Sequence, residues 1–274
     1  MKYFLQSVKY MMRNFIPLVM VAVLPAVILG LLVAPGGVPT FFVSYASGRG
    51  DLPQHFAGYL FNWRTLAAIA LILVIMIVGA SIIISAIEKH MRVGVMSVRS
   101  PIRLLNHSII PVAITLVFWT LLLVVFRFLL FGLLLLVNLI FGNNWVLSFI
   151  IMFAVYVGLL VLYLFLSSPL LLWTPCMMIY GYKFGDAASS SFRMAGKRSR
   201  RLFVAQLMPL LIIFGAQIII DLVFAPLSFP AAAPINIIMC LFLMMYFCSL
   251  SAVAYFDLAE LGRKDEEVPL FPNL

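Results

Sequence analysis

Long apolar runs alternate with short polar segments along the whole chain. Each run is continuous and lacks the two-residue alternation of a half-buried strand, so it predicts a helix, in which every backbone group is paired internally as lipid requires. A helix needs about 20 residues to cross a hydrocarbon core of roughly 30 Å. Six runs are long enough, which predicts an all-α polytopic membrane protein with transmembrane helices over residues 15–34, 65–87, 109–141, 145–182, 202–225 and 235–256.

Two of these runs are longer than one crossing requires. At 1.5 Å per residue, a helix over 109–141 would be roughly 50 Å long, and the run 145–182 is longer still. Tilting, or protrusion beyond the bilayer, has to absorb the excess. Pro169 and Pro175 are the expected kink positions in the second of the two runs.

The polar segments between the runs have a pattern of their own. Residues 1–14 predict an interfacial helix, because Lys2, Gln6, Lys9 and Arg13 fall on one helical face. The segment 183–201 predicts a second amphipathic helix, and a third basic segment, 88–107, is interrupted by Pro101. Residues 257–274 form a polar tail. No polar stretch is long enough for a separate soluble domain, so we expect one membrane domain over residues 1–274.

The composition removes whole classes of protein from consideration. Of the 274 residues, 65% are hydrophobic and 10% charged, and the mean hydropathy is +1.18. Soluble domains are about 45–50% apolar and about 25% charged. Too few polar residues remain to cover a water-exposed surface, which excludes a soluble enzyme, a disordered chain and a nucleic-acid-binding domain.

The basic residues predict the orientation in the membrane. If the N-terminus lies inside, 15 of the 18 Lys and Arg residues fall in cytosolic segments; Arg49 and Arg64 lie outside, and Arg127 lies within a span. The positive-inside rule therefore places both termini in the cytosol and the six helices in a plasma (inner) membrane.

The net charge of +9 is thereby concentrated on one side of the membrane. That distribution suits anionic lipids of the inner leaflet and needs no nucleic acid as a partner. The alternative is that the basic residues only set the topology. The residues expected to contact anionic lipid are Lys9, Arg13, Arg99, Arg103, Arg193, Lys197, Arg198, Arg200 and Arg201.

The basic segments also suggest an internal repeat. Ser7-Val8-Lys9, Ser97-Val98-Arg99 and Ser191-Phe192-Arg193 each lie in a basic segment and each precede a proline near the start of the next span. Three units of interfacial helix, outward helix and return helix are one interpretation. Chance similarity among basic amphipathic segments is the other.

One stretch of this pattern carries a resemblance to known proteins. An apolar helix with Ser168-Pro169 is followed by Asp186-Ala187-Ala188-Ser189, by Ser191-Phe192-Arg193 and by a new span at Leu202-Phe203. This order resembles uncharacterised bacterial six-helix membrane proteins, including the membrane region attached to some bacterial glycerophosphodiester phosphodiesterases. The resemblance covers mainly residues 165–215 and implies a similar helix arrangement. The chain contains no phosphodiesterase barrel, so no catalytic activity is implied.

Arg127 and Asp221 are the only strongly ionic residues well inside the predicted spans. If both helices stand upright, both residues lie about 27–29 Å from the inner interface, so they are candidates for an intramembrane pair. Three interpretations remain: each side chain reaches separately to the outer headgroups, the two form a structural pair, or they form a substrate or ion site.

Glu88, His90 and Arg92 form a second, weaker polar cluster at the inner end of a predicted span. A Glu-x-His pattern is compatible with metal binding or proton transfer, but a solvated interfacial cluster is the commoner explanation. The cysteines all fall within apolar runs and have no metal-binding spacing. We expect no catalytic residues, no metal and no cofactor.

These observations favour a protein without a catalytic site. The leading hypothesis is a lipid-organising or accessory membrane component, with the lipid bilayer and a second membrane protein as partners. A transporter or permease subunit is the first alternative, since such proteins use intramembrane charges. A lipid-modifying enzyme is the second.

The pairing of Arg127 with Asp221 is testable by a double-mutant cycle. If the two side chains pair, Arg127→Leu together with Asp221→Leu should destabilise the protein less than the two single changes added together, because each single change leaves one charge uncompensated. The free energy of unfolding in detergent measures this. Strict additivity would contradict the pair.

Overall fold

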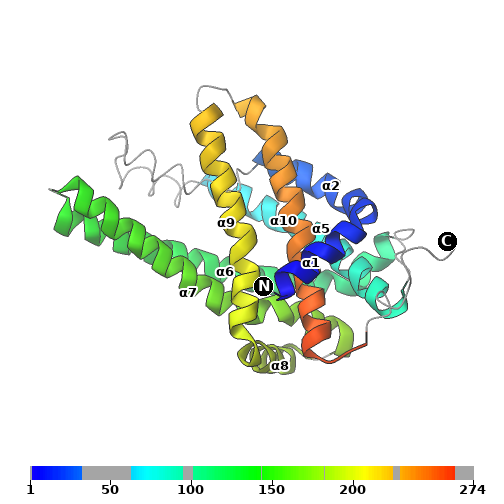
Figure 1. Ribbon diagram of the computed structural model, residues 1–274. Coiled ribbons are helices and arrows are strands. Elements are labelled where there is room, and N and C mark those ends of the chain that lie inside the picture. The colour runs from blue at the N-terminus through cyan, green and yellow to red at the C-terminus, as the bar shows by residue number, and fades with distance from the viewer. Residues whose placement is uncertain are drawn as a thin grey trace.

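A computed structural model describes residues 2–32, 63–94, 101–142, 144–181, 183–224 and 229–262, and this part of the chain is almost wholly helical. The expected all-α class is confirmed, and six of the helices are long and apolar enough to cross a membrane. The helices, labelled as in Figure 1, are α1 (Lys2–Arg13), α2 (Phe15–Leu32), α5 (Trp63–Val93), α6 (Pro101–Phe141), α7 (Trp145–Tyr180), α8 (Phe184–Lys197), α9 (Ser199–Phe224) and α10 (Phe229–Leu258).

Helices α5 and α6 extend beyond the predicted spans into the basic segment between them. The segment 88–107 contains no separate interfacial helix in its described residues: its first part extends α5, and its second part begins α6 at Pro101. Proline is common at the first position of a helix, because the backbone N–H that proline lacks would have no hydrogen-bond partner within the helix there. At the other end of the hairpin, α7 stops at Tyr180 because Gly181 takes a left-handed conformation with φ of 62°.

The order of an amphipathic helix followed by two long helices occurs twice, as α1-α2-α5 and as α8-α9-α10. The α6–α7 hairpin between them is preceded by no amphipathic helix among the described residues. The threefold repeat therefore stays a prediction.

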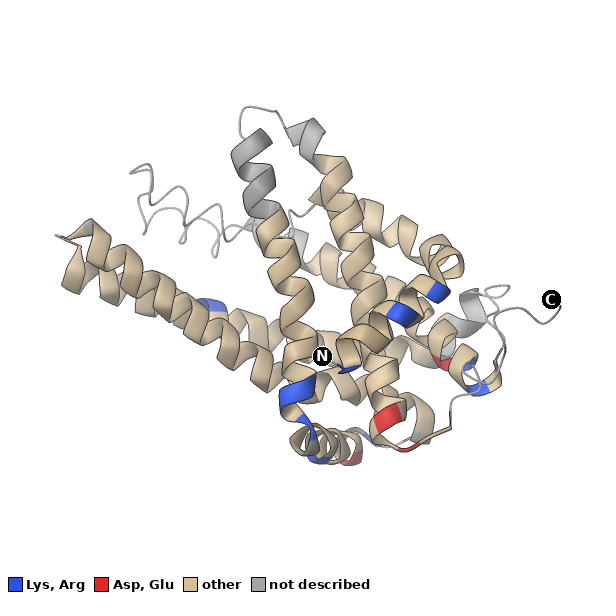
Figure 2. Ribbon diagram, viewed as in Figure 1, with Lys and Arg blue, Asp and Glu red and all other residues tan. Residues whose placement is uncertain are grey.

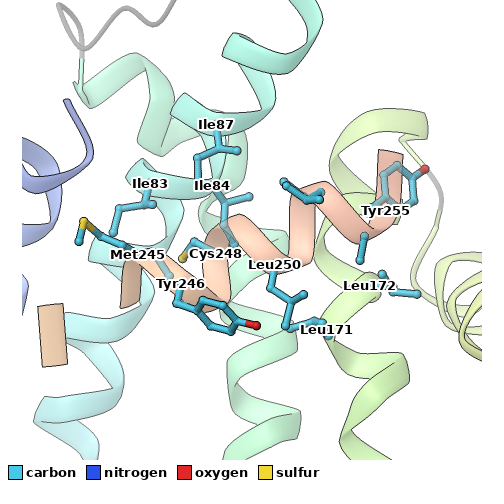
Figure 3. Close-up of a cluster of buried hydrophobic side chains, with 14 of the residues drawn as sticks. Ile83, Ile84, Ile87, Leu171, Leu172, Met245, Tyr246, Cys248, Leu250 and Tyr255 are labelled. Carbon is cyan, nitrogen blue, oxygen red and sulfur yellow. The ribbon is translucent and has the colours of Figure 1, made fainter. Parts of the chain in front are cut away.

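Helix α10 lies at the centre of the bundle. Two thirds of its most apolar stretch (67%) is buried inside the protein, compared with 11% for α6 and for α7. Figure 3 shows its side chains, including Met245, Cys248 and Leu250, packed between α5 and α7. Nearly all of the core lies around this helix.

Glycine allows α2 and α5 to approach their neighbours closely. A Cβ added to Gly30 in α2 would lie 2.5 Å from the Cα of Ile237 in α10. One added to Gly79 in α5 would lie 2.9 Å from the ring of Pro25 and 2.8 Å from Met244. Small residues at helix contacts are how membrane helices obtain close packing without a hydrophobic driving force.

Two prolines inside spanning helices leave backbone carbonyls without a helical partner, because proline has no N–H to donate four residues back. Pro175 frees the carbonyl of Leu171 in α7, and the Ser251 hydroxyl of α10 donates to it at 2.6 Å. Pro209 frees the carbonyl of Ala205 in α9, and the Tyr246 hydroxyl of α10 donates to that one, also at 2.6 Å. Helix α10 thus satisfies the backbone of both neighbours.

The α6–α7 hairpin diverges from the rest of the bundle (Figure 1). Its far half has a small core of its own, formed by Leu134, Val137 and Met152. The apolar stretch Ser108–Phe141 has 34 residues, about 51 Å at 1.5 Å per residue. Fitting that whole length into a core of about 30 Å would take an inclination of about 54° from the normal, which is more than the roughly 0–40° that spanning helices usually show.

The close approach at Gly30 predicts a contrast between two glycine substitutions. Gly30→Ala should lower the free energy of unfolding by about 1–3 kcal/mol, since the added methyl group forces α2 and α10 apart. Gly158→Ala in α7 should be neutral or stabilising by up to about 1 kcal/mol, because nothing lies within 4 Å of its Cβ position and alanine favours a helix. Unfolding in sodium dodecyl sulfate measures both. Equal effects at the two sites would refute the close contact.

Candidate functional site

Basic residues gather at one end of the bundle, where α1, α8 and the start of α9 meet the last turns of α5 and α10. We call this the basic end. In Figure 2 the blue segments cluster there, and the α6–α7 hairpin carries a single blue band. Arg127 is the only Lys or Arg between Arg103 and Lys183. Exposed at the basic end are Lys2, Lys9, Arg13, Lys89, Arg92, Lys183, Arg193, Arg198, Arg200 and Arg201.

One carboxylate, Asp257, holds this end together. Its Oδ1 atom lies 2.5 Å from Nζ of Lys2, and its Oδ2 atom accepts hydrogen bonds from the Tyr3 hydroxyl at 2.8 Å and from Arg198 at 3.2 Å. Lys2 and Tyr3 belong to α1, and Arg198 lies at the junction of α8 and α9. A single side chain of α10 therefore fastens both amphipathic helices to the core.

The surroundings keep the Tyr3 hydroxyl protonated. Burial, and then the neighbouring Asp257 carboxylate, raise the pKa of Tyr3 to about 12. The hydroxyl therefore remains a hydrogen-bond donor to Asp257 throughout the physiological pH range. Helix α10 ends just beyond this contact, where Glu260 adopts a φ of 56° and the N–H of Leu261 donates to the carbonyl of Phe256 at 3.0 Å.

The predicted polar cluster of Glu88, His90 and Arg92 is divided between two contacts. Arg92 donates to Glu88 at 2.8 Å within α5, while Nδ1 of His90 lies 2.9 Å from the buried hydroxyl of Tyr10 in α1. Among the described residues, no group of three or more His, Cys, Asp or Glu side chains is arranged to hold a metal ion. The cluster connects α1 to α5.

Helix α1 has a buried face in addition to the surface that it exposes. One face is buried in the bundle and includes Tyr3, Ser7, Tyr10 and Met11. The remaining surface is both apolar and basic: Leu5 and Met12 are 59% and 62% exposed, and Lys9 and Arg13 lie beside them in helical order. An exposed surface that combines apolar and basic side chains suits the boundary between headgroups and acyl chains.

Helix α8 repeats this arrangement. It buries the small side chains of Ala187, Ser191 and Ala195, and the Trp173 indole of α7 donates to the carbonyl of Phe184 at 3.3 Å. On its outer side Phe192 is 58% exposed next to exposed Arg193. Both amphipathic helices thus offer apolar and basic side chains to the same end of the molecule.

Several polar side chains inside the spans bind one another. Gln206 of α9 accepts from Ser167 at 3.0 Å and donates to Ser168 at 2.8 Å, both in α7. Thr174 of α7 donates to Thr115 of α6 at 2.8 Å. Interhelical hydrogen bonds of this kind hold membrane helices together.

Of the other predicted site residues, some are placed by the structure and some lie outside its described part. Arg198 binds Asp257, so it has a structural partner besides any lipid. Arg99 and the side chains of Arg103, Lys197 and Asp221 lie outside the described residues, so their roles, and the Arg127–Asp221 pair, stay predictions. Arg127 itself is exposed on α6, and an arginine at the centre of a spanning helix costs about 2.5–3.5 kcal/mol on insertion scales.

Sequence reasoning missed the residues that organise the basic end. Asp257 was assigned only to the tail and Tyr3 and Tyr10 only to an amphipathic helix. The signal for Asp257 was its place: one acid at the end of the last span, on the side where most bases are found. Nothing in the sequence pairs it with Lys2, which lies 255 residues away.

The Asp257 contacts predict that one neutral substitution will loosen α1 and the α8–α9 junction. Asp257→Asn should lower the free energy of unfolding by about 1–2 kcal/mol, since it removes two partly exposed ion pairs and weakens the bond from a buried tyrosine. Amide hydrogen exchange should accelerate in residues 2–13 before the rest of the bundle responds. Glu260→Gln, a nearby exposed acid, is the control and should change neither. Unaltered exchange in α1 of the Asp257 variant would rule out the clamp.

Comparison of the chain with protein-family models, with curated proteins and with solved structures found no match. The resemblance drawn from residues 165–215 therefore remains an expectation, and the chain is described by its architecture: a multi-pass membrane protein with six membrane-spanning helices.

Proposed function

We propose that this protein is a non-catalytic component of a plasma (inner) membrane that binds anionic lipids at its basic end. In this proposal the basic end and both termini face the cytosol. Its role is to organise lipid or to accompany another membrane protein.

One observation carries the proposal. The exposed basic side chains of α1, α8 and the start of α9 lie at one end of the bundle, beside exposed apolar side chains of the same helices. Apolar side chains enter the acyl region while neighbouring basic ones meet phosphates, each worth about 1 kcal/mol near an anionic surface. The Asp257 contacts hold α1 and the α8–α9 junction against α10, so the surface is ordered before lipid arrives.

The alternatives receive less support from the described residues. A permease needs a polar path across the membrane, whereas Ser167, Ser168, Thr174 and Gln206 form hydrogen bonds between helices. A lipid-modifying enzyme needs an acid, a base or a metal site, and Glu88 and His90 are each engaged with a neighbouring side chain. In liposomes, solute flux sensitive to Arg127 would favour the permease, and lipid turnover sensitive to Glu88 would favour the enzyme.

Removing two exposed arginines should weaken the preference for anionic lipid. For Arg200→Gln with Arg201→Gln, the preference for phosphatidylglycerol over phosphatidylcholine should fall by about 30-fold, corresponding to about 2 kcal/mol for two charges. Native mass spectrometry of the full chain, released from nanodiscs of mixed lipids, measures the ratio.

The matched control removes two charges from the other side. Arg49→Gln with Arg64→Gln changes the net charge equally, and the charge rule assigns these residues to the outer loop, so the inner-leaflet preference should persist. If both variants lost the same amount of preference for phosphatidylglycerol, the effect would depend on net charge alone, which would count against an organised lipid surface. No loss in either would contradict lipid binding at the basic end.

A further inference from the structure

Arg127 is the feature that the lipid-binding proposal leaves unused. It lies 19 residues beyond Ser108 and 14 before Phe141, the two ends of the apolar stretch of α6. Those separations correspond to about 28 Å and about 21 Å along the helix. The apolar stretch thus continues for several turns on both sides of the guanidinium group.

The surroundings of Arg127 do not neutralise it. Its exposed neighbours on α6 are apolar, with Leu123 38% and Phe128 46% exposed. On the side facing α7, the ring of neighbouring Phe126 packs against that of Tyr163, with the ring centroids 5.4 Å apart. In the part of the chain that the structure describes, every ion pair involves other residues, and no carboxylate lies within 4.0 Å of Arg127.

The depth of Arg127 follows from the inclination of the hairpin. An upright α6 would bring Arg127 level with Asp221 but would leave about 14 apolar residues beyond the bilayer. In Figure 1 the hairpin is inclined to α9 and α10. An inclination of about 54° from the membrane normal would keep the whole stretch in the hydrocarbon and place Arg127 near the mid-plane. At that depth the side chain is far from either headgroup layer.

We propose that the exposed face of the α6–α7 hairpin around Arg127 binds a membrane-spanning helix of a different protein, which supplies a carboxylate at mid-membrane depth. Charge complementarity selects the carboxylate, because an arginine in hydrocarbon is stable only beside an opposite charge or water. The apolar side chains around it suit the flank of a helix. The inference gives a partner to the accessory role proposed above, and it does not depend on lipid binding.

The carboxylates of this chain argue against a second copy as the occupant. Glu88 and Asp257 lie at the basic end. Asp221 lies 22 residues beyond the start of α9, about 33 Å away and therefore near the opposite surface. A neighbouring copy would place none of these three acids beside the mid-plane.

Site-specific cross-linking in native membranes tests this inference. A benzoylphenylalanine at Leu123, one helical turn from Arg127 on the same face, is photolysed in the full chain, and the adduct is identified by mass spectrometry. We expect a membrane protein, joined through a spanning segment that carries Asp or Glu. Arg127→Gln should reduce the adduct at least about tenfold. Arg127→Glu combined with Lys or Arg in place of the partner's acid should restore it.

Three controls distinguish this proposal from a general effect of charge, from lipid binding and from misfolding. Arg92→Gln removes one charge at the basic end and should leave the adduct unchanged. The Arg200 and Arg201 variant should keep the adduct even if it loses lipid preference, so the two proposals can fail independently. Unchanged unfolding of Arg127→Gln in detergent ensures that lost cross-linking does not reflect misfolding.

Several results would overturn the inference. An adduct with a second copy of this chain would show that the face binds another copy and not a different protein. An adduct with lipid alone would show that Arg127 reaches headgroups. A protein adduct that is indifferent to Arg127→Gln, or attached away from any acidic spanning segment, would remove the role of charge. The absence of any adduct would refute the docking face.

Discussion

Backbone carbonyls inside a membrane must find a partner within the protein, and in this molecule α10 supplies two of them. Pro175 and Pro209 each deprive a carbonyl of its helical N–H, and the Ser251 and Tyr246 hydroxyls of α10 donate in its place. Because an unsatisfied polar group in hydrocarbon costs several kcal/mol, these bonds determine where α7 and α9 rest against α10. The remaining helices pack around that arrangement.

The distribution of charged residues also follows from which partners are available in each environment. Where water and headgroups are near, the chain carries many bases, and one acid, Asp257, binds two of them along with Tyr3. Along the apolar stretches of α6 and α7, Ser108–Phe141 and Val146–Ile179, it carries a single Lys or Arg residue, Arg127. The first environment tolerates unpaired cations and the second does not. The two functional proposals rest on these two environments.

The architecture separates a well-packed end from an open one. Around α10 the core is continuous and joins α1, α2, α5, α7, α8 and α9. In its described residues, the far half of the α6–α7 hairpin has a small core of three buried apolar side chains. A protein organised in this way has a rigid support at the basic end and a long apolar surface extending from it. That division is consistent with the accessory role proposed above.

The sequence by itself determined the all-α class, the six membrane-spanning helices and the concentration of bases, because hydropathy and charge are summed over local stretches. It placed the third span correctly but did not show that α6 begins seven residues before Ser108, at Pro101, since the residues after Pro101 were compatible either with an interfacial segment or with the first turns of a long helix. Only the tertiary structure decided that α10 is central, that α1 has a buried face and that Asp257 binds Lys2. These features depend on contacts between residues far apart in the chain, such as the 255 positions between Lys2 and Asp257, and local periodicity carries no information about which helix meets which.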